Sequence, residues 1–184
     1  SLLVSSGDLL WCDESSEPDL FKATIGGMGL TGVIVDAKIK LKKVKTSFMD
    51  VSSTKVHSLE ELFDQQKQAM KTHEYLFTWI DSQKKGETIG RGVMQVANHS
   101  DEGKRVYVKQ KQFTVPLLPN FAVNRYSVKA FNFSYYHFRK RKVSDRQYFL
   151  NFFYPLNSFR KWNRVYVTKG FIEYQVVIPH SNAY

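Results

Sequence analysis

An alternation of apolar and charged residues stands out in the first quarter of the chain. From Val35 to Lys42, apolar side chains at odd positions alternate with charged side chains at even positions. A period of two residues is typical of a strand that buries one of its faces. We therefore expect a strand that begins at Val33 and runs to about Val44.

A dense cluster of glycines, residues 26–32, precedes this strand. Gly27, Gly29 and Gly32 have the G-x-G-x-x-G spacing of a dinucleotide-binding turn, which requires a strand before the glycines and a helix after them. Here the order is reversed, because residues 18–23 begin with proline and predict one short helical turn. The cluster is therefore not a Rossmann turn. Its glycines predict positive φ angles or a close approach of the backbone to another group.

The next part of the chain predicts a helix followed by a hairpin. Ser58 and Glu61 have the spacing of a capping box, and apolar residues at helical spacing follow them. Residues 74–81 are rich in strand formers, and a Lys-Lys-Gly turn joins them to residues 89–97. This pattern predicts two antiparallel strands.

The remaining elements are predicted from shorter patterns. We expect the helix after Ser58 to end near 71–73, strands at 9–12, 49–51, 106–115, 148–154 and 171–178, a helix within 120–138, and a compact aromatic segment at 155–169. Together these elements predict an α+β fold in which an antiparallel sheet carries helices on one face.

Composition supports a folded chain without a membrane span. Of the 184 residues, 42% are hydrophobic and 15% are aromatic, which excludes a disordered tail. The apolar runs are far shorter than the ~20 residues that cross a bilayer. Cys12 is alone, so the chain can form neither an internal disulfide nor a cysteine-based metal site. A single thiol fits a reducing compartment, and we expect a cytoplasmic protein.

The net charge of +10 is partly concentrated in one basic run, Arg139, Lys140, Arg141 and Lys142. This run is compatible with a solvated loop, with contact to an anionic membrane surface, and with nucleic-acid binding. The aromatic residues just before it would suit base stacking in a positive groove, namely Phe131, Phe133, Tyr135, Tyr136 and Phe138. No nucleic-acid motif accompanies them. A basic nucleic-acid-binding module is therefore kept as the alternative, and nucleic acid is not the expected partner.

Metal and nucleophile chemistry find no support in the residue spacing. The five histidines are scattered, with no pair three or four residues apart, so no metal site is predicted. The sequence has no G-x-S-x-G turn, and Cys12 lacks the flanking motif of a catalytic cysteine.

A better candidate site is the aromatic and polar cluster at 152–166, which leads into the predicted strand at 171–178. On that strand Glu173 and Gln175 would share one face. Carboxylate and amide groups beside aromatic walls suit a sugar-like ligand, because hydroxyls need donors and acceptors and sugar rings need a flat apolar surface. Trp79, with Asp81 on the same predicted strand, could form a second wall. Packing of a core corner is the alternative explanation for these aromatic residues.

Six short segments recur in the same order in a known family. The chain resembles the FAD-linked oxidases of the vanillyl-alcohol-oxidase type, and within them those that oxidise a lipid-linked sugar. The resemblance covers nearly the whole chain and is carried by residues 26–34, 78–81, 89–92, 154–157, 162–166 and 170–175. The glycine segment is shared by many FAD oxidases, whereas the last two segments are narrower and more specific.

The resemblance implies a division of the chain and a set of site residues. Residues 1–44 would be the end of an FAD-binding domain, and residues 45–184 would be part of a substrate-binding domain. The residues implied beside the cofactor are Gly29, Gly32, Val33 and Ile34. The residues implied around the substrate pocket and the flavin ring are Trp79, Phe153, Leu156, Asn157, Phe159, Trp162, Asn163, Glu173 and Gln175.

The resemblance also implies a reaction, in which FAD accepts a hydride from a carbinol carbon of a sugar or a lipid-linked sugar. Glu173 stands where the family has glutamine, so it would act as a base or select a different polyol. Asn157 stands where the family has aspartate. The family's pyrophosphate-binding loop would precede this chain and its active-site lysine would follow it, so we expect the fragment alone to be inactive. A basic run that docks on a membrane would suit a lipid-linked substrate.

Overall fold

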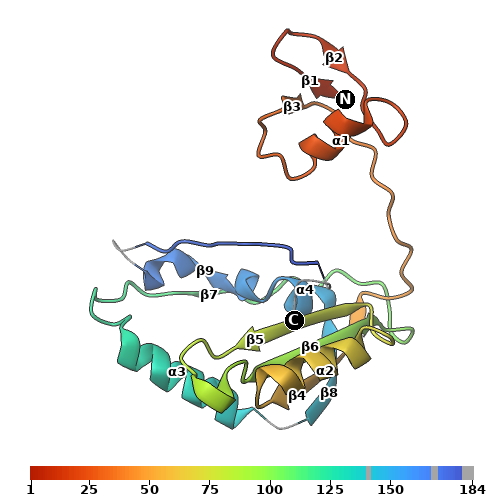
Figure 1. The fold of residues 1–184 in the computed structure, drawn as a ribbon. Coiled ribbons are helices and arrows are strands. Elements are labelled where there is room, and N and C mark those ends of the chain that lie inside the picture. The colour runs from red at the N-terminus through yellow and green to blue at the C-terminus, as the bar shows by residue number, and fades with distance from the viewer. Residues whose placement is uncertain (140–141, 167–169, 180–184) are drawn as a thin grey trace. The chain divides into compact units, whose positions relative to one another are not determined.

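A computed structural model describes residues 1–139, 142–166 and 170–179, with only the backbone of residues 142 and 143. The chain forms two compact units, Ser1–Lys43 and Val44–Tyr184 (Figure 1). The division falls one residue before the boundary implied by the family resemblance. The identity of each unit as part of a particular domain remains a prediction.

The first unit is built around a small antiparallel sheet with strand order β2-β1-β3. Its strands are β1 (Leu2–Leu3), β2 (Leu9–Leu10) and β3 (Val33–Ile34). The helix α1 (Pro18–Thr24) carries proline in its first turn, where the missing N–H costs nothing, so the helical turn predicted at 18–23 is confirmed. Leu2 is the buried centre of this unit.

The long strand expected from Val33 to Val44 is wrong. Only Val33 and Ile34 pair with β1, and residues 35–44 have no regular secondary structure. Ile39 and Leu41 are 76% and 84% exposed, although their alternation with lysines predicts a buried face. A strand needs a ladder partner, and the two-residue β1 is too short to supply one beyond β3.

The second unit contains a four-stranded antiparallel sheet with strand order β5-β6-β4-β8. Its strands are β4 (Phe48–Val56), β5 (Tyr75–Ile80), β6 (Gly92–His99) and β8 (Lys142–Tyr148). The hairpin predicted from residues 74–97 is confirmed, with the short 3-10 helix η1 (Gly86–Thr88) in its turn. The strand β8 was not expected, and it begins at Lys142, the last residue of the basic run.

The helix α2 (Leu59–Ala69) covers one face of this sheet. The Ser58 hydroxyl accepts the Glu61 N–H at 3.1 Å, and the Glu61 carboxylate accepts the N–H of His57 at 2.7 Å, which confirms the predicted cap. Leu62 of this helix packs against β4 and β6 residues of one face, namely Val56, Met94 and Val96. The helix ends two residues before the expected 71–73.

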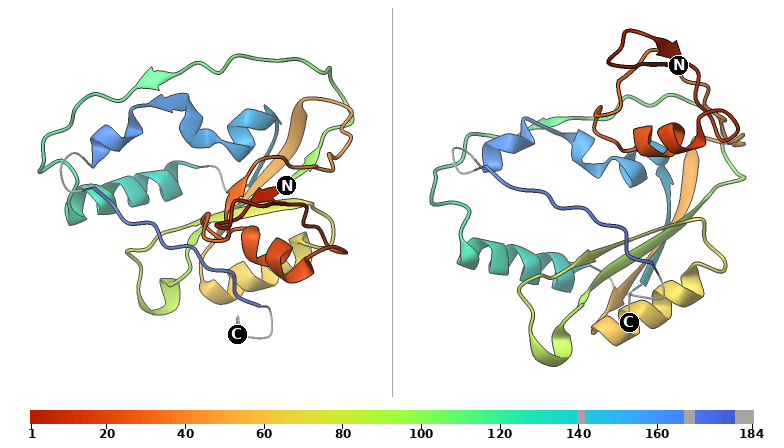
Figure 2. Two further views of the ribbon diagram at one scale, coloured as in Figure 1. Left: turned by 90° about the horizontal axis from the view of Figure 1, so that it is seen from above. Right: turned by 45° about the horizontal axis from the view of Figure 1, so that its top comes forward.

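The helices α3 (Arg125–Phe138) and α4 (Phe149–Phe153) lie on the other face, so the expected placement of helices on one face is wrong (Figure 2). Phe152 of α4 packs with Met49, Val51 and Ala97. Ala97 and its neighbour Val96 point to opposite faces, because side chains alternate along a strand. Both faces of the sheet therefore carry apolar residues, and each needs its own cover. The helix predicted within 120–138 is confirmed.

Three strands expected in the C-terminal half are absent or much shorter than predicted. Residues 148–154 form the end of β8 and the helix α4, because Phe149 and Phe152 are spaced to bury one helical face. The strand expected at 106–115 shrinks to β7 (Phe113–Thr114), which pairs in parallel with β9 (Phe159–Arg160). Residues 171–178 have no ladder partner and form no strand. The compact segment expected at 155–169 contains two short 3-10 helices, η2 (Pro155–Ser158) and η3 (Trp162–Val165). Its residues 167–169 lie outside the described chain.

Truncation of Leu62 tests the packing of α2. Leu62 is 2% exposed, whereas Leu59 on the same helix is 39% exposed. We expect Leu62→Ala to lower the free energy of unfolding by about 2–5 kcal/mol, and Leu59→Ala by clearly less. Urea unfolding followed by circular dichroism measures both losses. Equal losses would contradict the placement of α2 on the sheet.

Candidate functional site

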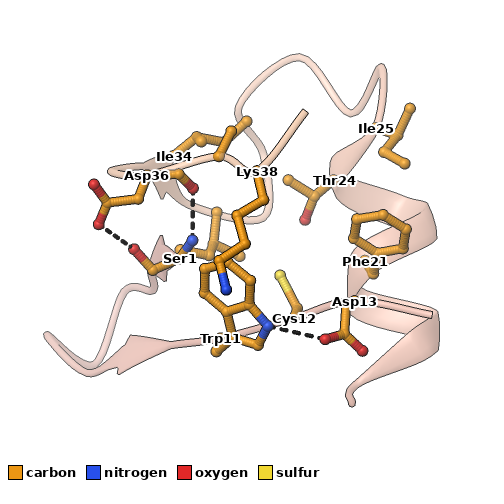
Figure 3. A pocket seen from close by; sticks show the side chains of 12 residues that line it. Ser1, Trp11, Cys12, Asp13, Phe21, Thr24, Ile25, Ile34, Asp36 and Lys38 are labelled. Carbon is orange, nitrogen blue, oxygen red and sulfur yellow. Dashed lines mark hydrogen bonds between the residues drawn. The ribbon is translucent and has the colours of Figure 1, made fainter. Parts of the chain in front are cut away.

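The first unit contains an apolar pocket of about 440 Å³ (Figure 3). Its walls come from the start of β1, from α1, from the segment after β2, and from β3 and the residues that follow it. The lining residues are Ser1, Leu2, Trp11, Cys12, Asp13, Phe21, Thr24, Ile25, Ile34, Asp36, Ala37 and Lys38. The pocket thus includes one residue of the predicted cofactor set, Ile34.

A hydrogen-bonded carboxylate orients the Trp11 ring in this pocket. Asp13 accepts the N–H groups of Ser16 and Ser15 at 2.8 Å each, and the indole N–H of Trp11 at 2.9 Å. The two backbone hydrogen bonds, followed by that of Trp11, hold the pKa of Asp13 below its ordinary value, so the carboxylate stays ionised. The Lys38 ammonium lies 4.7 Å from the centroid of the Trp11 ring. A flat aromatic wall beneath a cation can hold a planar or apolar group that carries negative charge.

The glycines beside the pocket divide into two kinds. A Cβ at Gly27 would lie 2.0 Å from the Ala23 carbonyl oxygen, and one at Gly32 would lie 2.4 Å from the Leu3 carbonyl oxygen. Gly26 and Gly29 have φ angles of 74° and 75°, and a Cβ there would meet no atom within 4 Å. Close backbone approach therefore explains the first pair. Positive φ explains the second pair, which borders open space.

The predicted cofactor residues lie on an exposed edge of the first unit. Val33 and Ile34 form β3 and are 64% and 59% exposed, and the nearby Met28 and Leu30 are 91% and 90% exposed. Gly32 is used for packing against β1, whereas Gly29 is open. Four apolar side chains at or before β3 are thus left largely uncovered in the first unit.

In the second unit, an aromatic pocket of about 460 Å³ lies beside the edge strand β5. Phe153, one of the predicted substrate residues, lines it together with Glu74, Tyr75, Leu76, Phe77, Phe152 and Pro155. The Phe153 ring lies 4.9 Å from that of Tyr75 in an edge-to-face arrangement. Phe153 is the one predicted substrate residue among those that line this pocket.

Trp79 belongs to a different aromatic group. It lies on the same sheet face as Tyr75, but its ring packs 4.6 Å from that of Tyr135 in α3. Trp162, in turn, packs 5.2 Å from Phe171 and contacts Tyr166. The ring contacts of the described residues therefore place Trp79, Phe153 and Trp162 in three separate clusters.

The other predicted substrate residues are exposed. Leu156 and Asn157 lie in η2, Phe159 begins β9, and Asn163 lies in η3. Glu173 and Gln175 are also exposed, and the expected strand that would align them on one face is not formed, because residues 170–179 pair with no other strand. Their role as ligand-binding residues remains a prediction.

Asp81 does not form the second pocket wall that the sequence suggested. Its side chain is 1% exposed, and it accepts hydrogen bonds from Arg91 at 2.7 Å and from Asn132 at 2.8 Å. Burial alone would raise the pKa of Asp81, but the hydrogen bonds from Arg91, Asn132 and the Gln83 N–H outweigh it and hold the pKa below its ordinary value. The carboxylate is thus fully used inside the protein.

Sequence reasoning missed this buried network, although a signal for it exists. The hairpin register pairs Ile80 with Gly92, so the next residues outward, Asp81 and Arg91, face each other. Prediction of the hairpin register would therefore have been enough to predict the ion pair between Asp81 and Arg91. The Asn132 contact comes from α3, 51 residues away, and has no local signal.

The basic run is divided between two elements. Arg139 follows α3, and its guanidinium lies 4.7 Å from the centroid of the Tyr135 ring. Lys140 and Arg141 lie outside the described residues, and Lys142 begins β8. Within the described part of the chain, no helix has both the length and the apolar character needed to cross a bilayer.

Comparison with known proteins shows that the chain is distantly homologous to an oxidase. This relative is the decaprenylphosphoryl-beta-D-ribose oxidase of Mycolicibacterium smegmatis, which is 26% identical over 190 residues, covering 97% of this chain and 41% of that protein. The uncharacterized protein in mprA 5'region of Streptomyces coelicolor is 33% identical over 99 residues, covering 54% of this chain and 26% of that protein. No protein-family model matches the chain.

These findings confirm the relation indicated by the sequence motifs and limit what it implies. The chain spans less than half of the length of both relatives. It corresponds to part of the mycobacterial oxidase, and the activity of a whole enzyme does not follow from it.

Replacement of Asp81 tests the buried network. We expect Asp81→Asn to lower the free energy of unfolding at neutral pH by about 3–5 kcal/mol, because the Arg91 charge stays buried without its partner. The pKa of Asp81 is lower in the folded chain, so its stabilisation is present above the unfolded value of ~3.9 and is lost as the pH falls through the folded value. The difference between wild type and variant should therefore shrink below about pH 4. Urea unfolding at neutral and acid pH measures both effects.

An exposed ion pair supplies the control. Asp101 lies 3.0 Å from Lys45, and its side chain is 75% exposed. We expect Asp101→Asn to change the stability by less than about 1 kcal/mol. If Asp81→Asn and Asp101→Asn lowered the free energy of unfolding equally, the buried network would stabilise the fold no more than an exposed ion pair does.

Proposed function

We propose that this chain is part of an FAD-dependent oxidoreductase that oxidises a secondary alcohol of a sugar or a sugar-lipid to a ketone. The supporting observation is the similarity to decaprenylphosphoryl-beta-D-ribose oxidase, which extends over 97% of the chain. Because the chain corresponds to 41% of that enzyme, the activity would belong to a larger protein. The isolated chain would not turn over by itself.

The open part of the glycine loop supports a cofactor beside the first unit. Gly29 has a positive φ and open space where a side chain would be, and Val33 and Ile34 present exposed apolar surface next to it. Such a surface fits the approach of a flat, largely apolar group to a backbone without side chains in the way. Gly32 would act indirectly, by holding β3 against β1. When bound, FAD would supply the hydride acceptor for the reaction.

The second unit would supply the groups that recognise the substrate. The aromatic pocket around Phe153 offers an apolar wall, and the rings of Trp79, Phe159 and Trp162 offer further ones. Leu156 would add aliphatic surface. The amides of Asn157, Asn163 and Gln175 can each donate to and accept from a hydroxyl, and the exposed carboxylate of Glu173 can accept its proton. These groups would bind and orient the alcohol group of the substrate.

A matched pair of glycine variants tests the cofactor side of this proposal. Gly29 and Gly7 both have positive φ angles, 75° and 89°, and both border open space. Alanine at either position should therefore cost a similar backbone strain, about 1–2 kcal/mol. We expect Gly29→Ala to weaken FAD binding by the protein that contains this chain by about tenfold, which is about 1.4 kcal/mol, and Gly7→Ala to leave it unchanged.

The ratio of flavin absorbance to protein absorbance, measured at several FAD concentrations, gives the two affinities. A purified wild-type protein that is colourless and takes up no FAD would contradict the proposed function. If the two variants bound FAD with equal affinity, only the cofactor role of Gly29 would be contradicted, and not the proposed function.

We further propose that the end of α3 contacts an anionic membrane surface, which would suit a cytoplasmic enzyme with a lipid-linked substrate. Phe131, Phe133 and Phe138 are 60%, 55% and 84% exposed, and Arg139 follows directly. Exposed aromatic residues beside basic ones suit the headgroup region of an anionic bilayer.

Vesicle sedimentation tests this contact. We expect the chain to bind vesicles that contain phosphatidylglycerol more tightly than neutral ones, and Phe138→Ser to weaken that binding. The control is Phe171→Ser, because Phe171 is 51% exposed but lies outside α3. Equal binding to both vesicle types would contradict the membrane contact. Tighter binding to single-stranded oligonucleotides, with an affinity that falls steeply as salt is added, would also contradict it.

A further inference from the structure

A groove of about 430 Å³ lies where β4, the β5–β6 turn and α3 meet. Its lining residues are basic, hydroxylic or imidazole-bearing, and none is acidic: Lys55, His57, Thr88, Arg91, Tyr136 and His137. We propose that this groove binds a phosphate group. The proposal does not depend on flavin chemistry and uses none of the residues assigned above to the cofactor or the substrate.

Arg91 and Tyr136 form the floor of the groove. They are 8% and 4% exposed, and the Arg91 guanidinium carbon lies 4.3 Å from the centroid of the Tyr136 ring. One terminal nitrogen of Arg91 donates to Asp81 at 2.7 Å, whereas its buried Nε has no hydrogen-bond partner in the described chain. A buried guanidinium with unused donors is unusual and favours an acceptor that the protein itself does not supply.

Lys55 supplies the positive charge that no carboxylate of the groove neutralises. Its ammonium donates to the His137 carbonyl at 3.2 Å and lies 5.2 Å from the centroid of the Tyr136 ring. Since an ammonium has three N–H donors, Lys55 retains donors for a ligand. The charge of Arg91, by contrast, is balanced by Asp81, so Lys55 is the residue whose loss should weaken anion binding most.

The Tyr136 hydroxyl sets the orientation of the His57 ring at the rim. It donates to the Val56 carbonyl at 3.2 Å and lies 2.8 Å from Nδ1 of His57. Both of these contacts are made inside the protein, so neither the Tyr136 hydroxyl nor Nδ1 of His57 is counted as a donor to the ligand. The Thr88 hydroxyl likewise donates to the Lys85 carbonyl at 3.0 Å, so the Lys55 ammonium and the Arg91 guanidinium are the groups that would hold the phosphate.

The groove is larger than a free phosphate ion, so the expected ligand carries its phosphate on a larger body. A sugar phosphate and the phosphate headgroup of a lipid share this chemistry. Both would be recognised through charge-assisted hydrogen bonds, which are the strong ones in proteins.

Titration of the 184-residue chain with glycerol 1-phosphate, at constant ionic strength set by chloride, tests the site. We expect saturable binding that Lys55→Gln weakens about tenfold, as for the loss of one charge-assisted hydrogen bond. The control is Lys67→Gln, which removes the same charge from an exposed position on α2 across the sheet. Neither lysine is part of the core, so the thermal midpoint of each variant should match that of wild type.

Two outcomes support the proposal and two overturn it. Binding of glycerol 1-phosphate identifies a soluble phosphate ester as the ligand class, and Lys55-dependent binding only to phosphatidate vesicles identifies a lipid headgroup. Absence of binding to both, or an equal weakening by the Lys55 and Lys67 variants, would overturn it. None of these outcomes depends on whether the protein binds FAD. Failure of the phosphate proposal can therefore be distinguished from failure of the proposed function.

Discussion

The buried contact of Asp81 with Arg91 and Asn132 determines how the second unit is put together. It joins the end of the β5–β6 hairpin to α3, which no backbone hydrogen bond of the sheet does. Because a displaced α3 would take the Asn132 amide away from the buried Asp81 carboxylate, this hydrogen bond holds α3 in one position relative to the hairpin. The packing of Trp79 on α3, and the contact of Arg91 with Tyr136 in the floor of the groove beside Lys55, follow from this position.

Backbone packing explains part of the glycine cluster in the first unit. Gly27 and Gly32 are required because the backbone of α1 and of β1 comes too close for a side chain. Their presence therefore needs no ligand to explain it. The case for a cofactor is carried by the open loop position Gly29 and by the exposed apolar strand β3, together with the relation to the mycobacterial oxidase.

Local sequence patterns predicted the elements that find their partners nearby. The cap at Ser58, the helix α2 and the β5–β6 hairpin are of this kind, since each is stabilised by residues within a short stretch of chain. The patterns failed where a strand needs a distant partner. Residues 35–44 and 171–178 have the composition of strands, but no neighbouring strand in the described chain pairs with them. Conversely, β8 pairs with β4 across about 90 residues, and its mixed sequence, with only Val143 and Tyr148 as strand formers, gave no strand pattern.

The same distinction holds for the candidate site. Family motifs select Trp79, Phe153 and Trp162, but the fold distributes them over three aromatic clusters. The polar network around Arg91 depends on contacts between β4, the hairpin turn and α3, and no single segment of the sequence contains it. The motifs thus indicate what kind of chemistry to look for, whereas the geometry decides which groups can act together.

The most direct test of the central claim is the reduction of bound flavin by a substrate alcohol. The protein that contains this chain, loaded with FAD, would be mixed without oxygen with a lipid-linked ribose, and its visible flavin absorbance would be followed in time. We expect the absorbance to be lost, and deuterium on the carbinol carbon to slow the loss, because the hydride would come from that carbon. Flavin that stays oxidised in the presence of lipid-linked ribose and of other sugar alcohols would contradict it.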